Sequence, residues 1–165
     1  MRRAVVITAS DGVSAGTRED TSGARVEERL QALGFVVQRA VLPDEQAILT
    51  EVLRETANAH DLVVTTGGTG LTPRDVTPQA TKDAIDYEVP GLAEAMRAAG
   101  RASTPFADLS RGVVGVIGKA LVVNLPGSPR GALESLAALE GVLDHALETL
   151  AGPYDHDVEA RGPAE

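Results

Sequence analysis

The chain has 165 residues, 43% of them hydrophobic and 24% charged, which is the composition of a soluble globular protein and excludes a disordered or fibrous one. Its formal net charge of -9 has the wrong sign for binding a nucleic-acid backbone, and only 2% of its residues are aromatic. It has no cysteine, which excludes disulfides, thiolate metal sites and cysteine nucleophiles.

The apolar run at the N-terminus, before Asp11, is too short for a signal peptide or a membrane span. We therefore expect a cytoplasmic protein that binds neither membranes nor nucleic acid. A chain of this length predicts one domain, which we place at residues 1–152.

Three apolar runs, at residues 4–7, 35–42 and 62–64, predict short β-strands, and the first and third lack alternation, as strands buried on both faces do. Between these strands, apolar residues recur at the spacing of a helix. The first helix contains Val26, Leu30 and Leu33 and ends at Gly34.

A second helical stripe covers residues 48–57. Alternation of strands and helices predicts an α/β fold, in which right-handed crossovers build a parallel sheet with helices on both faces. Later in the chain, residues 112–126 hold two β-rich runs separated only by Gly118-Lys119, which predicts a two-residue hairpin. The sheet should therefore be mixed, mostly parallel with one antiparallel strand.

A long helix follows, because Ser128 can cap it and Pro129 can open it. We expect it to lie flat on the sheet. Residues 153–165 are polar and acidic without a period, and we expect a flexible C-terminal tail. The apolar positions of the helix keep helical spacing: Leu133, Leu136, Leu139, Val142, Leu143, Ala146, Leu147 and Leu150.

Ligands of open α/β sheets bind beyond the carboxyl ends of the strands, so the loops after the strands are the candidates for a site. The first, residues 10–23, is fourteen residues long where two to six would suffice, which suggests a binding loop. The second holds Asp44, for which a helix N-cap and a catalytic role are equally open.

The third loop is Thr66-Gly67-Gly68-Thr69-Gly70. It is neither a Walker loop nor a dinucleotide fingerprint, since no Gly-Lys-Ser/Thr follows and Pro73 stands where a third glycine would be. Its glycines permit close approach of an anion or polar ring to backbone N–H groups, and Thr65, Thr66 and Thr69 add hydroxyl donors. A plain tight turn would need fewer glycines.

Two further loops carry polar groups. Residues 124–130 lead into the N-terminus of the long helix. This helix end could bind a phosphate, or it could simply be capped by a serine. Asp75 is flanked on both sides by prolines, which restrict the backbone. Thr77 is expected to cap another helix and Pro78 to be its first residue.

Asp44 and Asp75 form the pair that a magnesium-nucleotide site needs, because Mg²⁺ takes one or two carboxylates plus substrate phosphates. Asp11 and Asp20 are reserve ligands, and Arg74 and Arg130 are candidate phosphate clamps. A zinc site is disfavoured by the spacing of the three histidines, and a serine hydrolase by the lack of a Gly-x-Ser-x-Gly elbow.

Several motifs in order along the chain resemble those of the MogA/MoaB family of molybdenum cofactor biosynthesis, from about Val5 to Tyr154. The motifs are Ser10-Asp-Gly-Val-Ser-Ala-Gly16, Asp20-Thr-Ser-Gly23, Leu42-Pro-Asp-Glu45, Thr65-Thr-Gly-Gly-Thr-Gly70, Arg74-Asp-Val-Thr-Pro78, Glu88-Val-Pro-Gly91, Ser110-Arg111 and Leu125-Pro-Gly-Ser-Pro129. Each is modest alone, but the ordered set is specific.

The resemblance implies a three-layer α/β/α sandwich, commonly a homotrimer and in some cases a hexamer, with residues 1–152 as a single molybdopterin-binding domain. It implies transfer of AMP from ATP, with Mg²⁺, to the terminal phosphate of molybdopterin, with release of pyrophosphate. A molybdate insertase would be the downstream partner.

Carried over to this sequence, the family pattern makes Asp44 and Asp75 the catalytic and metal-binding residues, Thr66 to Gly70 the pterin and phosphate loop, and Gly127-Ser128-Pro129 a second substrate loop. The remaining motif residues are expected to bind substrate: Ser14, Asp20, Ser22, Glu88, Pro90, Gly91, Ser110 and Pro126.

Other assignments remain open. A molybdopterin carrier without chemistry would share the fold, although both aspartates argue against it. The insertase has a longer chain, and the competence-damage family has a Gly-Gly-Leu-Gly-Pro-Thr loop with a double aspartate where this chain has a single Asp75. The motifs do not separate a molybdenum from a tungsten pathway.

Overall fold

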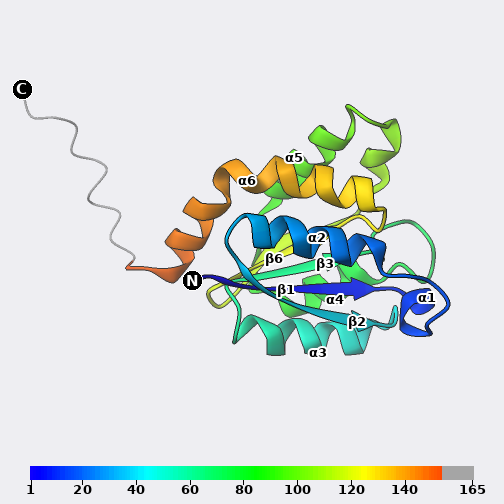
Figure 1. Ribbon diagram of the computed structural model, residues 1–165, viewed down its shortest axis with the longest axis horizontal. Helices are drawn as coiled ribbons and strands as arrows, with labels where there is room; N and C mark the ends of the chain where they lie inside the picture. The colour runs from blue at the N-terminus through cyan, green and yellow to red at the C-terminus, as the bar shows by residue number, and fades with distance from the viewer. Residues whose placement is uncertain (154–165) are drawn as a thin grey trace, which may run out of the picture.

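The computed structural model describes residues 1–153 (Figure 1). Its elements run in the order β1 (Arg3–Ala9), α1 (Asp11–Ser14), α2 (Thr21–Ala32), β2 (Val36–Leu42), α3 (Gln46–Ala57), β3 (Leu62–Thr66), α4 (Thr77–Ala84), β4 (Tyr87–Glu88), α5 (Pro90–Gly100), the 3-10 helix η1 (Pro105–Leu109), β5 (Val114–Ile117), β6 (Ala120–Leu125) and α6 (Pro129–Ala151).

The strands form one sheet in the order β2-β1-β3-β6-β5-β4. β2, β1, β3 and β6 are parallel to one another, whereas β5 is antiparallel to both β6 and β4. The strand β5 is thus the one that runs against the rest of the described sheet, which confirms the prediction of a mostly parallel sheet with one antiparallel strand.

Helices cover both faces of the sheet (Figure 1): α2, α5 and α6 on one side, α3 and α4 on the other. Side chains of β1 alternate between two cores, because successive residues of a strand point to opposite faces. Ala4 and Val6 pack with Leu30 of α2, whereas Val5 and Ile7 pack with Leu53 of α3. The predicted three-layer α/β/α sandwich is confirmed.

The strands predicted from apolar runs are present, and all of β3 and all but the first residue of β1 are buried. Helix α2 buries Val26 and Leu30, and Gly34 follows it at φ +89°, a left-handed conformation that glycine adopts without a steric cost. The hairpin between β5 and β6 turns at Gly118, with φ +57°.

The fourteen-residue loop predicted at residues 10–23 is wrong in extent. Ser10 accepts a hydrogen bond from Val13 N–H and caps α1, and Asp20 accepts one from Gly23 N–H and caps α2. Both are N-cap signals that an interpretation of the stretch as one loop overlooks. Only residues 15–20 connect the two helices.

The cap predicted at Thr77 is also displaced. Val76 is the N-cap of α4, and Thr77 is the first helical residue. The Thr77 hydroxyl donates to Gly67 O at 2.9 Å and its N–H donates to Gly68 O at 3.1 Å. The residue therefore holds the glycine loop instead of capping its own helix.

The long helix α6 packs on the sheet between α2 and α5, and its cap is as predicted: Ser128 accepts from Gly131 N–H. Leu136, Leu139, Leu143 and Leu147 are buried. Residues 154–165, most of the predicted tail, lie outside the described part of the chain. Among the helices of residues 1–153, none combines the length and apolarity needed to cross a membrane.

A buried amide joins the two halves of the sheet. Asn124, fully buried on β6, donates through Nδ2 to Thr65 Oγ1 at 3.0 Å and Thr81 Oγ1 at 2.9 Å, and its Oδ1 accepts from Val113 N–H at 3.1 Å. Thr65 is consequently turned inward and is not the exposed hydroxyl donor that the sequence suggested.

We expect Asn124→Leu to lower the free energy of unfolding by about 3 kcal/mol, because Val113 N–H and two threonine hydroxyls would be left buried without partners. Urea unfolding of the ligand-free protein measures this loss. The matched control is Asn58→Leu, since Asn58 is exposed at the end of α3. Equal stability of the two variants would show that the buried network contributes little.

Candidate active site

A polar cleft of about 590 Å³ lies beyond the carboxyl ends of the parallel strands, at the end of the molecule where α1 lies in Figure 1. It is lined by residues from the loops after β1, β3 and β6 and by Asp44 from the loop after β2. The sequence-predicted residues that line it are Asp20, Ser22, Asp44, Thr66, Gly67, Gly68, Asp75, Gly127 and Ser128.

The glycine loop brings bare backbone to the floor of the cleft. Gly67 and Gly68 have φ of +88° and +67°. A Cβ on Gly67 would lie 2.5 Å from Ala9 O, and one on Gly68 would lie 2.3 Å from Thr77 Oγ1 and 3.1 Å from Asp44 Oδ1. Neither position tolerates a side chain, so main chain alone faces the ligand space.

Asp44 is not the cap of α3, which excludes the capping alternative; its catalytic role stays a prediction. The N-cap of α3 is Glu45, which makes no side-chain cap bond. Asp44 Oδ2 accepts from Asp11 N–H at 2.9 Å, while Oδ1 is buried without a hydrogen-bond partner. Burial raises the pKa of Asp44, and Asp11 and Asp75 nearby raise it further, against a lowering by the Asp11 N–H.

Asp75 is held by its own turn. Its Oδ2 accepts from Thr72 N–H at 2.9 Å and Thr72 Oγ1 at 2.7 Å. A Cβ on Gly70 would lie 2.9 Å from the same oxygen, so the glycine makes room for the carboxylate. Asp75 lines the cleft, and both hydrogen bonds from Thr72 go to Oδ2, not to Oδ1.

These two carboxylates fit a hard divalent cation. A buried carboxylate oxygen without a partner is costly unless a ligand satisfies it, and Asp44 Oδ1 is such an oxygen. Residues 1–153 contain no cluster of three or more acidic or histidine side chains poised for a metal. Magnesium does not require one, because one or two carboxylates with substrate phosphates and waters complete its shell.

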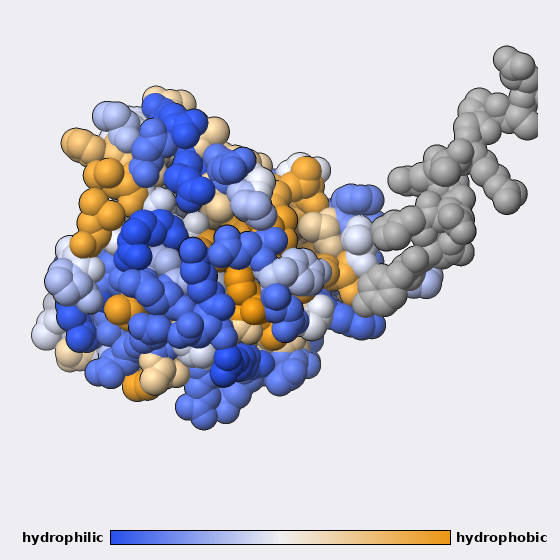
Figure 2. All heavy atoms as spheres, turned by 180° about the vertical axis from the view of Figure 1, so that it is seen from behind, coloured by the Kyte–Doolittle hydropathy of each residue, from blue (hydrophilic) through white to orange (hydrophobic). Residues whose placement is uncertain are grey.

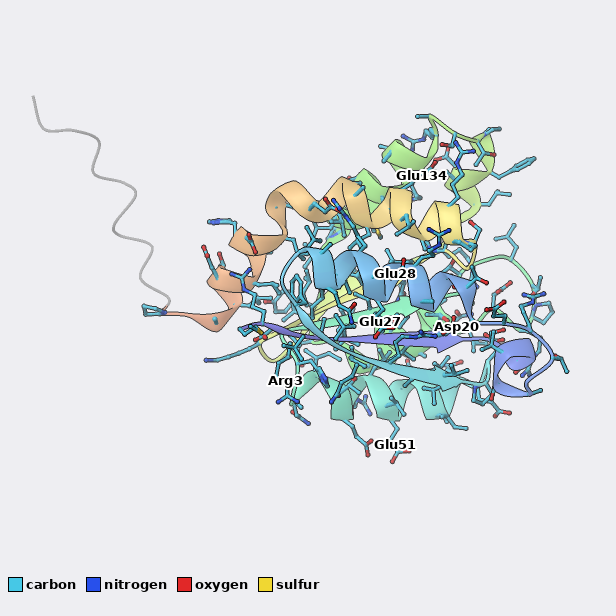
Figure 3. All side chains as sticks on the ribbon, in the orientation of Figure 1. Arg3, Asp20, Glu27, Glu28, Glu51 and Glu134 are labelled. Atoms are coloured by element: carbon cyan, nitrogen blue, oxygen red, sulfur yellow. The ribbon has the colours of Figure 1, made fainter. Side chains whose placement is uncertain are left out.

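Asp20, a reserve metal ligand in the sequence analysis, is already engaged. It caps α2 and its Oδ2 accepts from Arg39 at 2.7 Å, while Oδ1 also accepts from Thr8 Oγ1 at 2.9 Å. The Ser22 and Thr66 hydroxyls continue this chain, from Ser22 to Thr66 to Thr8, at 3.2 Å each. Asp20 thus orders hydroxyl groups in the cleft wall beneath the start of α2, where Figure 3 labels it.

The two arginines considered as phosphate clamps are both paired in the structure. Arg74 forms a two-point ion pair with Asp11. Arg130 pairs with Glu134 and the Ser103 hydroxyl and does not line the cleft. Both phosphate-clamp roles therefore remain predictions that require these arginines to change partners.

Arg111 was not selected as a site residue from sequence. Its guanidinium donates to Gly70 O at 2.8 Å and Asp75 O at 2.7 Å, and its N–H donates to Thr69 O at 2.9 Å. It thereby clamps both ends of the 70–75 segment. The Ser110-Arg111 motif could have marked Arg111 as a site residue, but only the fold shows which atoms the arginine contacts.

A smaller hollow of about 160 Å³ adjoins the cleft at Ser128, under α5 and η1. Ser110 and Pro126 line it. Thr69 is buried and Gly70 supports Asp75, and neither lines the main cleft. Ser14 ends α1, and Glu88, Pro90 and Gly91 lie at β4 and the start of α5; these four line neither hollow, and their binding roles stay predictions.

Cleft residues that the sequence analysis did not single out include Arg18 and Thr8. Arg18 makes no ion pair within residues 1–153 and supplies a positive charge to the cleft. Nothing in its sequence neighbourhood marks it as a site residue. Its position becomes apparent only when α1 folds back at the end of β1.

A three-layer α/β/α sandwich with a polar cleft beyond its parallel strands defines the class of α/β domains that bind small polar ligands at the sheet edge. Within that class, the chain belongs to the family described as "Probable molybdopterin binding domain", whose model matches residues 5–145.

The chain is 36% identical over 156 residues to a molybdopterin adenylyltransferase of Helicobacter pylori J99, covering 90% of this chain and 88% of that protein. It is 39% identical over 170 residues to the molybdopterin adenylyltransferase of Escherichia coli K12, covering 90% and 85%. The crystal structure of the molybdopterin biosynthesis enzyme MoaB from Thermus thermophilus matches with a TM-score of 0.86 at 48% identity, over 94% of this chain and 100% of that one. The resemblance to the MogA/MoaB family is confirmed.

The raised pKa of Asp44 predicts a stability gain on neutralisation. Ionised Asp44 costs free energy in the folded state, so Asp44→Asn should raise the melting temperature of the ligand-free protein above the raised pKa. The gain should shrink as the pH falls through the raised pKa toward 3.8, the ordinary value of an unfolded aspartate, because the folded wild type then takes up the proton that removes the unfavourable charge.

Thermal unfolding from about pH 8 down to about pH 4 measures this difference. The control is Glu28→Gln, which removes an exposed carboxylate on α2. A pH-independent difference for Asp44→Asn, or one that grows toward acid, would contradict the assignment of an unfavourable buried charge.

Proposed function

We propose that the protein is a molybdopterin adenylyltransferase, which transfers AMP from ATP to the terminal phosphate of molybdopterin and releases pyrophosphate. The observation that carries the proposal is Asp44 Oδ1, a buried carboxylate oxygen without a partner that faces the backbone of Gly68 and lines the same cleft as Asp75. Relatives with this activity in their names cover most of the chain.

In the proposed reaction, an oxygen of the molybdopterin phosphate attacks the α-phosphorus of ATP. The new P–O bond replaces the bond between the α-phosphorus and the bridging oxygen, which leaves with pyrophosphate. No proton needs to be removed from a phosphate oxygen that is already ionised. The work of the protein is therefore to align two anions and neutralise their charge.

Asp44 and Asp75 would hold Mg²⁺, which supplies positive charge to polyphosphate oxygens when it is bound. The protein's own groups act beside it. Backbone at Gly67 and Gly68 can approach phosphate oxygens without side-chain obstruction, and Arg18 adds a cation. The N-terminus of α6 lies at the cleft, where Ser128 and Pro129 line it, and the positive end of the helix dipole there favours a phosphate.

A molybdopterin carrier without chemistry is the alternative. It would use the same glycine loop but would have no need for a destabilising carboxylate at position 44. Equal affinity for molybdopterin with and without MgATP, and no pyrophosphate release, would favour the carrier.

We expect Asp75→Asn to fold and to lose about a hundredfold or more of turnover, because an amide cannot replace the negative charge. An amide oxygen can still accept the two bonds from Thr72, so the turn should persist. The assay mixes protein, molybdopterin and MgATP and follows adenylylated molybdopterin by chromatography and pyrophosphate release in parallel.

Glu28→Gln serves as the control for a lost negative charge outside the cleft. Full activity of Asp75→Asn would remove Asp75 from the mechanism. Binding of molybdopterin by the wild type without nucleotide consumption would replace the enzyme assignment with the carrier.

We further propose a cytoplasmic homotrimer, or a hexamer, that passes its product to a molybdate insertase. An exposed apolar surface supports self-association: Phe106 and Leu109 of η1 are 73% and 51% exposed, and Leu71 is 65% exposed. Figure 2 shows apolar side chains at the upper left, the end of the molecule where α5 lies, and a second group nearer the middle of that face.

Sedimentation equilibrium should therefore give a mass of about three times the 17.1 kDa of the chain, or a multiple of that. Phe106→Asp should dissociate the assembly if η1 forms the contact, whereas the surface control Val142→Asp, on α6, should leave it intact. A monomer at all concentrations would contradict the proposed assembly.

A further inference from the structure

Asp11 is connected by hydrogen bonds, directly or through a neighbouring arginine, to the segments that carry both candidate catalytic carboxylates. It follows β1, whereas Asp44 follows the neighbouring strand β2, and Ala9 pairs with Leu42 at the ends of those strands. The two aspartates exchange hydrogen bonds: Asp11 N–H donates to Asp44 Oδ2 at 2.9 Å, and Asp44 N–H donates to Asp11 Oδ1 at 3.0 Å. Side chains thus continue the β1–β2 ladder into the cleft.

This exchange orients Asp44. Because Oδ2 is tied to Asp11 N–H, the plane of the carboxylate is fixed and Oδ1 is left facing Gly68. A freely rotating carboxylate would turn toward solvent, since a buried charge without a partner is costly. The Asp11 loop therefore opposes that rotation.

The Asp11 carboxylate reaches the other side of the cleft through Arg74. Arg74 Nε donates to Asp11 Oδ2 at 2.9 Å, and Nη2 donates to Oδ1 at 3.1 Å, which is the two-point geometry that fixes both direction and distance. Arg74 immediately precedes Asp75, whose backbone is clamped by Arg111. Asp44, Asp11, Arg74 and Asp75 form one connected chain of contacts.

The charges of these contacting residues also affect how close the carboxylates can lie to one another. Arg74 interacts favourably with the carboxylates of Asp11, Glu45 and Asp44, while Asp11 and Asp75 both repel the charge of Asp44. Without a cation the carboxylates would repel one another and separate. Arg74 supplies the positive charge that keeps them together before substrates arrive.

We propose that Asp11 and Arg74 are positioning residues that act as one brace, holding Asp44 and Asp75 at a fixed separation in the ligand-free protein. The structural role of the brace does not depend on the proposed function; only its expected effect on catalysis does. It also changes the interpretation of both residues, since Asp11 is then not a reserve metal ligand and Arg74 is not a free phosphate clamp.

Amide hydrogen exchange tests the brace without any substrate. The Asp44 N–H, which donates to Asp11 Oδ1, should exchange about tenfold faster in Arg74→Gln, because the Asp11 carboxylate loses its anchor. In Asp11→Ala the same N–H should exchange at least as fast, and the double variant should be no faster than Asp11→Ala alone. Arg3→Gln, at the opposite end of β1 (Figure 3), is the matched control.

Unchanged exchange at Asp44 in Arg74→Gln would overturn the brace. So would a double variant in which the two effects simply multiply, because independent residues act additively in free energy. Wild-type protein that lacks adenylyltransferase activity would remove the proposed function but leave this exchange measurement valid.

Kinetics separate the brace from the phosphate clamp. Asp11→Asn keeps an oxygen that can accept from Asp44 N–H but loses the ion pair, so a brace predicts that Asp11→Asn and Arg74→Gln both lower kcat, by about tenfold, with little change in KM for MgATP. A clamp predicts opposite signs: KM rises in Arg74→Gln and falls in Asp11→Asn, which frees the arginine. Opposite signs would overturn the brace.

Discussion

The site depends on one constraint, the parallel register of β2, β1, β3 and β6, which ends four strands at the same edge of the sheet. Thr8 pairs with Thr66 and Thr66 with Leu125, so the loops that follow start side by side. Gly67 N–H then donates to Leu125 O at 3.2 Å, and a Cβ on Gly127 would lie 3.3 Å from Gly67 Cα. Bare backbone at both positions follows from this close packing of loops.

The cleft is stabilised around an unfavourable group. Hydroxyls, Asp20 and Asn124 are fully bonded, whereas Asp44 Oδ1 alone among buried side-chain polar atoms of residues 1–153 lacks a partner. Such an exception in an otherwise satisfied region is typical of functional sites, where ligand binding supplies the missing interaction. The Asp11 and Thr72 contacts keep the two carboxylates in place while that interaction is absent.

Much of the fold was predictable, because hydrophobic periodicity reports which faces are buried. The sequence did not reveal α5, since Pro90-Gly91 resembles a turn, although proline is favoured in the first turn of a helix and stands at its first position here. Within the site, Asp44, Asp75 and the glycines were recognisable from local patterns. The Asp11–Arg74 pair and the Arg111 clamp join residues far apart in the chain, and no local pattern encodes such contacts.

A chain with a net charge of -9 would be expected to repel two polyanionic substrates. The arrangement of charges in the structure reduces this repulsion near the cleft. An arginine can bind a phosphate most readily when it is not already paired with a carboxylate. Arg39, Arg74 and Arg130 are paired with acids, whereas Arg111 is bound to carbonyl oxygens and Arg18 makes no ion pair in the described chain. Among the arginines without a carboxylate partner, Arg18 lines the cleft, and Arg111 is bonded to the carbonyl oxygens of Gly70 and Asp75, so these two place positive charge next to the glycine loop and the cleft.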